Sequence, residues 1–232
     1  MNIGYFGGTF DPIHRGHLAV AEAAAKHCKL RQVLFVPADV PPHKQKLKIT
    51  PFIHRYAMLA LALAEAKLER FVPSLLESPL EGKGPRYSID TIRRLKRALS
   101  KNDQLIFILG LDSFWDIAKW RQPEDLLREC EFVVISRPGY SLEDLAGALP
   151  QSLRPKTLVN KKAPSRKSPL STLALPGVTI HLVAGVRVPV SATEVRATLV
   201  RAQTKTPREK LEKMLPRSVI EYIRKMHLYE VE

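Results

Sequence analysis

Short apolar runs alternate with longer helix-forming stretches along this chain. Residues 18–25 and 50–67, for example, are rich in amino acids that favour helices. Strands that alternate with helices build a parallel sheet whose two faces are covered by the helices. We therefore predict the α/β class, with a doubly wound parallel sheet. The apolar runs that we assign to its strands are residues 2–6, 32–37, 71–77, 104–109, 131–136 and 177–183.

The remaining helices are predicted from their start signals and apolar stripes. Ser88 is expected to cap a helix that runs to about Leu99, and a short helix follows over residues 123–130. Two amphipathic helices, residues 207–214 and 216–226, come last. An apolar stripe on the second should pack these C-terminal helices on the helix layer of the sheet. That stripe consists of Val219, Ile220, Ile223 and Met226.

The first strand runs straight into a glycine turn and a helix start. Gly7 and Gly8 end the apolar run. Asp11 and Pro12 form a helix-start signal, in which Asp11 caps the helix and Pro12 suits its first turn. A helix start presents unpaired backbone N–H groups and the positive end of the helix dipole, so it attracts anions.

Two histidines lie at this predicted helix start. His14 and His17 are three residues apart and share one face of a helix. Gly16 has no side chain, which lets a ligand approach closely. We predict a phosphate site with two imidazoles directed into it. A His-x-x-His pair can also be half of a zinc site, but no nearby cysteine or acidic residue completes one, and both rings can also be solvated.

A second helix start follows the last predicted strand. Ser191 is its expected cap, and Glu194 completes a capping-box pattern. Thr193 adds a hydroxyl group, and Arg196 lies one turn further along. We predict that the helix starts near residues 14 and 191 converge on one triphosphate.

Polar residues also follow other strands, at the edge where open α/β sheets bind ligands. After the strand at 32–37, a double proline holds a loop extended, and His43 and Lys44 project from it. A solvated basic loop is the alternative interpretation. At the end of the strand at 131–136, Arg137 can meet a phosphate or a base.

The strand at 104–109 leads into Gly110 and then Asp112, which suits contacts to hydroxyl groups or metal-bound water. Trp120 can stack on a flat aromatic ring, although a purely structural role is the alternative. Trp115 is assigned to the core. On the helix at 50–67, we assign three polar or aromatic residues to packing and surface: His54, Arg55 and Tyr56.

Residues 145–176 contain no Asp or Glu, six Lys or Arg and five Pro. This composition predicts a long, poorly packed connection. We expect one domain over residues 1–232 with a basic, Pro/Ser-rich insertion at about 147–176. A solvated loop is favoured there, while a lid over the phosphates and an arm that contacts RNA stay open.

The 232 residues carry a net charge of +14, which favours anionic partners such as nucleotides and phosphates. Cys28 and Cys130 suggest no disulfide framework. The apolar run at residues 58–64 is far shorter than the ~20 residues needed to span a bilayer, and we see no signal peptide. We expect a cytoplasmic protein without a membrane partner.

The string GGTFDPIHRGH at residues 7–17 resembles the signature of the HxGH nucleotidyltransferases, and most closely that of the bacterial nicotinate-nucleotide adenylyltransferases. Pro41-Pro42-His43-Lys44 and the spacing from Asp112 to Trp120 resemble the same family. So does the second signature at residues 190–196, with Ala192 where the family usually has a second Ser.

The resemblance implies a Rossmann-like fold and adenylyl transfer from ATP to nicotinate mononucleotide, giving deamido-NAD and pyrophosphate, with Mg²⁺ carried by ATP. His14, His17 and Arg196 are the expected catalytic residues. The expected ATP-binding residues are Gly7, Gly8, Thr9, Phe10, Gly16, Gly110, Asp112, Ser191 and Thr193. The expected mononucleotide-binding residues are His43, Lys44, Tyr87, Ser88, Trp120 and Arg137.

Two alternatives stay open at this point. A related HxGH enzyme would use another phosphorylated acceptor, such as nicotinamide mononucleotide or phosphopantetheine. A basic nucleic-acid-binding protein on the same fold would bind RNA in a salt-sensitive way and release no pyrophosphate. The presence of His14, His17 and Arg196 argues against nucleic acid as the partner. A homo-oligomer is possible.

Overall fold

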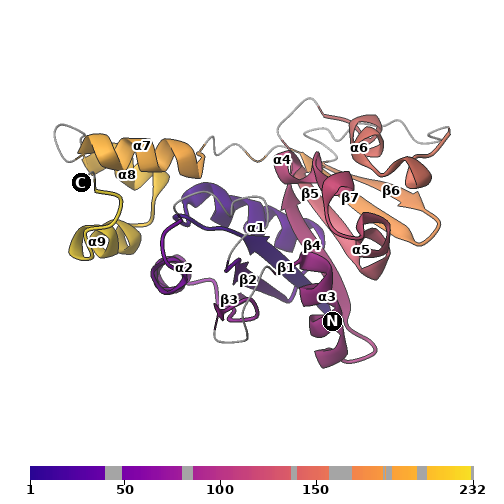
Figure 1. The fold of residues 1–232 in the computed structure, drawn as a ribbon, viewed down its shortest axis with the longest axis horizontal. Coiled ribbons are helices and arrows are strands. Elements are labelled where there is room, and N and C mark those ends of the chain that lie inside the picture. Colours follow the sequence, from indigo (N-terminus) through magenta and orange to yellow (C-terminus); the bar gives the residue numbers. More distant parts are fainter. Residues whose placement is uncertain are drawn as a thin grey trace. The chain divides into compact units, whose positions relative to one another are not determined.

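The structure is a computed structural model that describes residues 1–39, 49–79, 86–136, 140–156, 169–184, 186, 190–202 and 208–230. Within these residues, seven strands form one sheet in the order β3-β2-β1-β4-β5-β7-β6 (Figure 1). The strands are β1 (Asn2–Gly8), β2 (Gln32–Pro37), β3 (Phe71–Pro73), β4 (Gln104–Gly110), β5 (Glu131–Ser136), β6 (Leu170–Leu175) and β7 (Val178–Ala184).

The centre of the sheet is parallel. β1 pairs with β4, β4 with β5, and β5 with β7, each in parallel register. Tyr5 lies opposite Phe107, and Phe107 lies opposite Phe132. These are the long apolar runs of the sequence, and β4 and β5 are buried along nearly their whole length. The predicted α/β class with a mostly parallel, Rossmann-like sheet is confirmed.

Helices connect the strands and follow them. The helices of the described residues are α1 (Arg15–His27), α2 (Phe52–Ala66), α3 (Ser88–Ala98), α4 (Leu111–Phe114), η3 (Ile117–Lys119), α5 (Pro123–Glu129), α6 (Leu142–Ala148), η4 (Gln151–Leu153), α7 (Ala192–Ala202), α8 (Arg208–Met214) and α9 (Arg217–Lys225). None of these helices has the length and apolar character that a bilayer crossing requires.

The chain divides into two compact units, and the division runs through β1 and β2. Unit 1 comprises residues 1–7, 20–34 and 87–187. Unit 2 comprises residues 8–19, 35–86 and 188–232.

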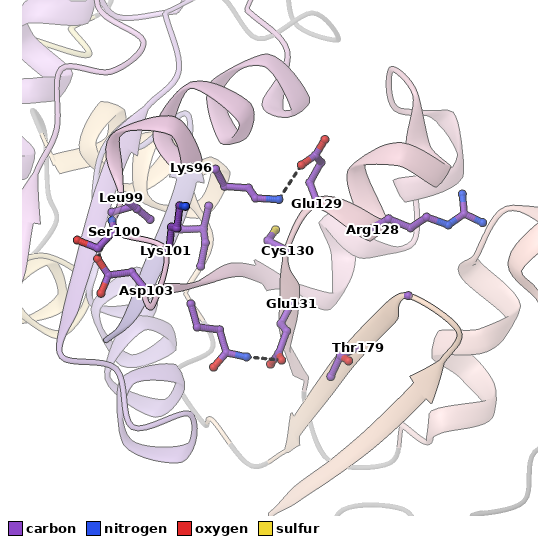
Figure 2. A pocket seen from close by; sticks show the side chains of 13 residues that line it. Lys96, Leu99, Ser100, Lys101, Asp103, Arg128, Glu129, Cys130, Glu131 and Thr179 are labelled. Carbon is purple, nitrogen blue, oxygen red and sulfur yellow. Dashed lines mark hydrogen bonds and ion pairs between the residues drawn. The ribbon is translucent and has the colours of Figure 1, made fainter.

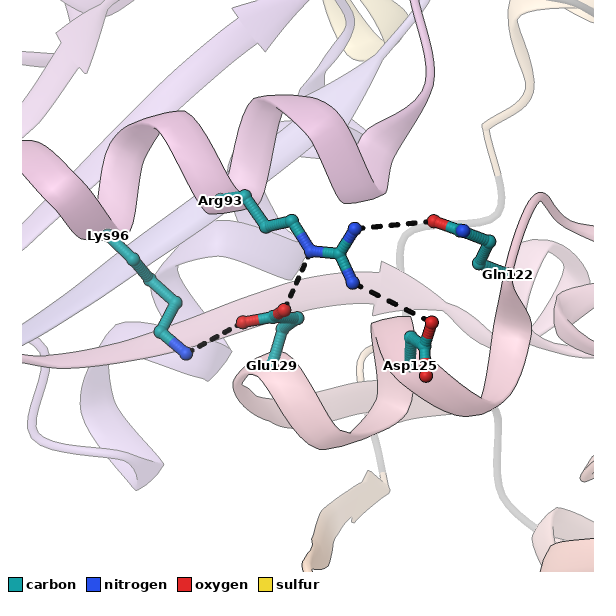
Figure 3. Close-up of polar contacts among 5 residues, drawn as sticks. All are labelled: Arg93, Lys96, Gln122, Asp125 and Glu129. Atoms are coloured by element: carbon teal, nitrogen blue, oxygen red, sulfur yellow. Dashed lines mark hydrogen bonds and ion pairs between the residues drawn. The ribbon is translucent and has the colours of Figure 1, made fainter.

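Aromatic rings fill the core of unit 1. Phe107 of β4 packs edge-on against Tyr5 at 4.7 Å between ring centroids, and it contacts Phe132 of β5 at 5.3 Å. Outside this core, α3 and α5 are joined by an ion-pair network (Figure 3). Glu129 accepts hydrogen bonds from Arg93 Nε and Lys96 Nζ, both at 2.8 Å, and this double contact lowers its pKa.

The C-terminal helix α9 packs against α2 within unit 2. The backbone N–H groups of Arg217 and Ser218 donate to the Glu65 carboxylate of α2 at 3.0 and 2.7 Å, so a side chain of α2 satisfies the start of α9. Val219, Ile220 and Ile223 are buried, as predicted. Met226 is 41% exposed instead, because the helix ends at Lys225 and the chain leaves the stripe.

Four other local predictions are wrong. Part of the expected loop at 145–176 is ordered, because β6 pairs with β7 through a turn at Pro176-Gly177, where Gly177 has φ +73°. The strand predicted at 71–77 ends at Pro73. Ser88 is the first residue of α3 and makes no cap, since Tyr87 holds the cap position. Trp115 is 39% exposed, because Leu111, Phe114 and Ile117 take the buried positions around it.

Candidate active site

Two histidine rings organise the start of α1. The helix begins at Arg15, so His14 is the residue immediately before it and His17 is its third residue. The His17 backbone N–H donates to His14 Nδ1 at 3.3 Å, and the His14 backbone N–H donates to His17 Nδ1 at 3.2 Å. This reciprocal pair is a capping box built from imidazoles, in which each ring satisfies an N–H group of the helix start.

The two bonds fix the tautomer of both rings. Because each Nδ1 accepts a hydrogen bond from a backbone N–H, the proton of each neutral imidazole lies on Nε2. The rings stack with their centroids 3.6 Å apart and their planes at 21°. Two imidazolium cations at this distance would repel strongly, so the arrangement favours neutral rings that donate from Nε2.

Burial supports the neutral form of His14. Its side chain is 5% exposed, and desolvation lowers its pKa to about 4. The ring can therefore donate a hydrogen bond at neutral pH without carrying a charge.

Phe10 and Gly16 hold these rings in place. Phe10 is fully buried, has φ +47°, and packs edge-on against the His17 ring at 5.0 Å. A left-handed backbone at a bulky residue costs about 1–3 kcal/mol, so the surrounding contacts must enforce it. A Cβ added at Gly16 would lie 3.0 Å from the His14 ring and 3.2 Å from the Val190 carbonyl oxygen. A side chain at this position would therefore crowd the His14 ring, which would have to shift by a few tenths of an ångström.

Asp11 does not cap α1, contrary to our prediction. It lies four positions before Arg15, and the histidine pair already caps the helix. Its buried carboxylate instead accepts hydrogen bonds from the Thr50 backbone N–H at 3.3 Å and from the Tyr229 hydroxyl at 2.6 Å. Asp11 therefore joins the loop after β1 to the start of α2 and to the C-terminal turn. The Asp11–Pro12 bond is cis.

Arg55 is the largest fully buried side chain of the described residues, at 1% exposure, and we had assigned it to packing and surface. Its guanidinium donates to four backbone carbonyl oxygens: Thr9 at 2.8 Å, Ala38 at 2.7 Å, Asp39 at 2.9 Å and Thr50 at 2.7 Å. Burial lowers its pKa, while the charges of Asp11 and Asp39 oppose that shift. A signal existed in the sequence, because Arg55 lies on the apolar stripe formed by Phe52, Met58 and Leu59.

The second helix start lies close to the first within unit 2. Ser191 Oγ accepts the Glu194 backbone N–H at 3.2 Å, so its predicted capping role is confirmed. Arg196 Nη1 donates to the Asp11 carbonyl oxygen at 2.7 Å, and Nη2 lies 3.4 Å from Thr193 Oγ1. The structure therefore brings Arg196 and Thr193 to the loop that leads into His14.

Several candidate residues belong to unit 1. Gly110 ends β4, and Asp112 is exposed on α4 directly after it. Trp120 is half-buried and packs on Phe107 at 6.1 Å. Tyr87 lies under the guanidinium of Arg121 at 4.5 Å, a cation–π contact that links the start of α3 to the residue after Trp120. Arg121 was not predicted, and only its position next to Trp120 could have indicated it.

Ser88 also lies in unit 1, half-buried at the start of α3. Gly7 and Gly8 end β1 beside Thr9. Three predicted residues lie outside the described residues: His43, Lys44 and Arg137.

A cavity of about 420 Å³ in unit 1 contains none of the predicted residues (Figure 2). It lies at the amino ends of β4, β5 and β7, whereas open α/β sheets bind ligands at the carboxyl ends. Its carboxylates are already bonded: Asp103 to the N-terminal ammonium, Glu129 to Lys96 and Glu131 to His181. We therefore place no function there. In the described part of the chain, no group of three or more His, Cys, Asp or Glu is arranged to hold a metal ion.

Replacement of His14 by Asn should make stability less dependent on pH. The folded-state pKa of about 4 lies below the ordinary 6.5, so the unfolded chain binds the extra proton as the pH falls between these values. The stabilisation is complete above the ordinary pKa and is lost toward pH 4. Between pH 7 and pH 5, wild type should lose about 2 kcal/mol more unfolding free energy than His14→Asn, which keeps a capping oxygen. Urea unfolding at both pH values measures this, and equal losses would contradict it.

Replacement of Arg55 by Lys should destabilise the protein by roughly 2–4 kcal/mol, because a point ammonium cannot reach carbonyl groups in several directions and leaves some of them unsatisfied. The matched control is Arg217→Lys, whose guanidinium is exposed and bonded to Glu221. That variant should stay within about 0.5 kcal/mol of wild type. Urea unfolding compares the two, and similar small changes would show that the carbonyl contacts of Arg55 are unimportant.

Comparisons with known proteins agree on one family. A family model described as cytidylyltransferase-like matches residues 5–198. A relative from Solibacter usitatus is 35% identical over 229 residues, covering 99% of this chain and 100% of its own length. A relative from Pelobacter propionicus is 36% identical, covering 99% and 98%. Both are named as probable nicotinate-nucleotide adenylyltransferases.

A solved structure supports the same fold. The nicotinic acid mononucleotide adenylyltransferase of Plasmodium falciparum, complexed with NaAD, has a TM-score of 0.71 and 22% sequence identity, and the match covers 98% of this chain and 97% of that one. At this identity the likeness concerns the fold. From the two sequence relatives and the family model, this chain belongs to the nicotinate-nucleotide adenylyltransferase family of cytidylyltransferase-like proteins.

Proposed function

We propose that His14, His17 and Arg196 carry out adenylyl transfer from ATP to nicotinate mononucleotide in this chain, giving deamido-NAD and pyrophosphate. The activity itself, adenylyl transfer in NAD biosynthesis, follows from the family. The observation that supports these residue roles is the position of Arg196, whose guanidinium bonds to the Asp11 carbonyl oxygen at 2.7 Å, three residues before His14. Two helix starts and a fixed cation thus share one region of unit 2.

The reaction needs positioning and neutralisation of charge more than a protein nucleophile. A phosphate oxygen of the mononucleotide attacks the α-phosphorus of ATP in line. The new bond joins that oxygen to the α-phosphorus, and the bond from the α-phosphorus to the bridging oxygen breaks. Pyrophosphate leaves with the electron pair of that bond. Negative charge therefore grows on the bridging oxygen and on the pyrophosphate.

The neutral rings of His14 and His17 would donate from Nε2 to the α-phosphate and bridging oxygens. Their Nδ1 atoms are held by backbone N–H groups, so the donors are already oriented before the charge develops. Thr9 and the Phe10 backbone would contact the same phosphates, with Gly7, Gly8 and Gly16 keeping side chains out of their path.

Arg196 would bind the leaving pyrophosphate together with the hydroxyl groups of Ser191 and Thr193. The side chain of Arg196 is half-buried and already held at Nη1, so few conformations are lost when phosphate binds. Ala192 offers no hydroxyl, so we assign no side-chain phosphate contact to that position.

The other candidate residues would bind the two nucleosides. Gly110 and Asp112 would contact ATP, and Trp120 would stack on the pyridine ring beside Tyr87 and Ser88. His43 and Lys44 would hold the acceptor phosphate, and Arg137 would contact the mononucleotide; these three lie outside the described residues.

Mg²⁺ would arrive bound to the phosphates of ATP and would neutralise charge on the pyrophosphate. The donor set that the structure describes suits this, because Asp112 is a single exposed carboxylate that can contact metal-bound water, and Mg²⁺ usually keeps several waters. We also propose a cytoplasmic location for the protein.

The direct test measures pyrophosphate release from ATP with one acceptor at a time. Nicotinate mononucleotide should support the fastest reaction, ahead of nicotinamide mononucleotide and phosphopantetheine. Faster release with phosphopantetheine would assign the chain to a related activity. Salt-sensitive RNA binding without pyrophosphate release would overturn the enzymatic proposal.

Replacement of His17 by Ala should lower kcat by ~10²–10³, as expected for the loss of one oriented donor to the transition state. The control is His27→Ala, which removes a histidine from the opposite end of the same helix and should leave kcat unchanged. Fixed-time assays of released pyrophosphate give kcat for both variants, and circular dichroism checks their fold. A loss of less than about fivefold in a folded His17→Ala protein would reject the assigned role.

A further inference from the structure

The C-terminal turn of the chain reaches the loop between β1 and α1, residues 9–14 of unit 2, which we call the signature loop. After α9 ends, residues 226–229 form turns, and Tyr229 takes φ +61°. Its hydroxyl donates a 2.6 Å hydrogen bond to Asp11 Oδ1. This short hydrogen bond joins two residues that are 218 positions apart in the sequence. Because its acceptor is a carboxylate, it is stronger than a hydrogen bond between two neutral groups.

Asp11 passes this contact on to two other segments. Its second carboxylate oxygen accepts the Thr50 backbone N–H at 3.3 Å, and its carbonyl oxygen accepts Arg196 Nη1 at 2.7 Å. Asp11 is 6% exposed, so the loop that carries it is fixed by these protein contacts more than by solvent. One hydrogen bond therefore connects Tyr229 to Asp11, and a second, from the backbone carbonyl of Asp11, connects Asp11 to Arg196.

We infer that Tyr229 is a positioning residue for the phosphate site, holding Asp11 so that its carbonyl group fixes the guanidinium of Arg196. The inference rests on the role that we propose for Arg196. It adds a residue from outside both signature motifs to the parts that the reaction requires.

Of the two hydrogen bonds that orient the guanidinium of Arg196 in the described part of the chain, the one to the Asp11 carbonyl oxygen is the shorter. Among the described residues, the other hydrogen bond of its guanidinium, from Nη2 to Thr193 Oγ1, is 3.4 Å long. The Asp11 carbonyl at 2.7 Å is therefore the main protein acceptor that sets its direction. If the backbone at Asp11 shifts when its carboxylate is released, the carbonyl group shifts with it. Arg196 then loses its orientation while its charge remains.

Tyr229 is suited to act as a permanent donor. Burial raises the pKa of its hydroxyl, and the nearby charge of Asp11 raises it further, so the group keeps its proton across the neutral range. Arg55 holds Thr50, the residue whose N–H group bonds to the other oxygen of Asp11. Asp11 is thus constrained from two sides, and removal of the hydroxyl of Tyr229 releases only one of them.

The test compares two Tyr→Phe variants of the same C-terminal segment. Tyr229→Phe removes the hydroxyl that bonds to Asp11. Tyr222→Phe removes a hydroxyl that bonds to His54 Nδ1 on α2 at 2.9 Å, away from the signature loop. We expect Tyr229→Phe to lower kcat/KM for ATP about tenfold, which corresponds to about 1.4 kcal/mol, with the KM for the acceptor unchanged. Tyr222→Phe should keep the wild-type kcat/KM.

A double-mutant cycle separates positioning from general destabilisation. In the Arg196→Ala background, Tyr229→Phe should cause less than a twofold further loss, because the group that it orients is already absent. An equal tenfold loss in both backgrounds, or no loss in either, would overturn the inference.

A binding measurement keeps this test apart from the proposed reaction. The thermal unfolding midpoint of wild type should rise on addition of Mg-ATP alone, and the rise should be smaller for Tyr229→Phe than for Tyr222→Phe. If wild type releases no pyrophosphate with any acceptor, the proposed function fails, while this midpoint comparison still decides the role of Tyr229. Equal midpoint rises in both variants would overturn that role.

Discussion

A buried guanidinium on an apolar helix face fixes the geometry around the signature loop. Burial of the charged guanidinium of Arg55 inside unit 2 is costly unless its N–H groups find acceptors. Four backbone carbonyl oxygens accept them, in the loops that follow β1 and β2 and near the start of α2. One of them belongs to Thr9, next to the strained Phe10. The conformation of the loop thus depends on a side chain 46 residues further along the chain.

The need for hydrogen-bond partners also determines the arrangement at the start of α1. Backbone N–H groups at the first turn of a helix need acceptors, and here the acceptors are the rings that we assign to the chemistry. Asp11 does not cap the helix, and its hydrogen bonds instead link the loop to Thr50, Tyr229 and Arg196. Fold and proposed site are therefore built from one set of hydrogen bonds.

Much of the fold could be predicted because the strands at 104–110 and 131–136 are long apolar runs buried on both faces. β6 was missed because it is a half-exposed edge strand within a Pro-rich and Ser-rich stretch. The capping role predicted for Asp11 was wrong because His14, three residues later, caps the helix instead. Tyr229 carries no local signal at all, since its partner lies 218 residues away, and the roles of the site residues stay predictions.

The reciprocal caps have a consequence for how kinetic effects at this site combine. Each imidazole supports the backbone N–H group beside the other, so deleting one ring also unseats its neighbour. The two histidines then behave as a single functional unit, and the loss from removing both will fall well short of the product of the individual losses. Dividing the rate enhancement between them residue by residue has no physical meaning in such an arrangement.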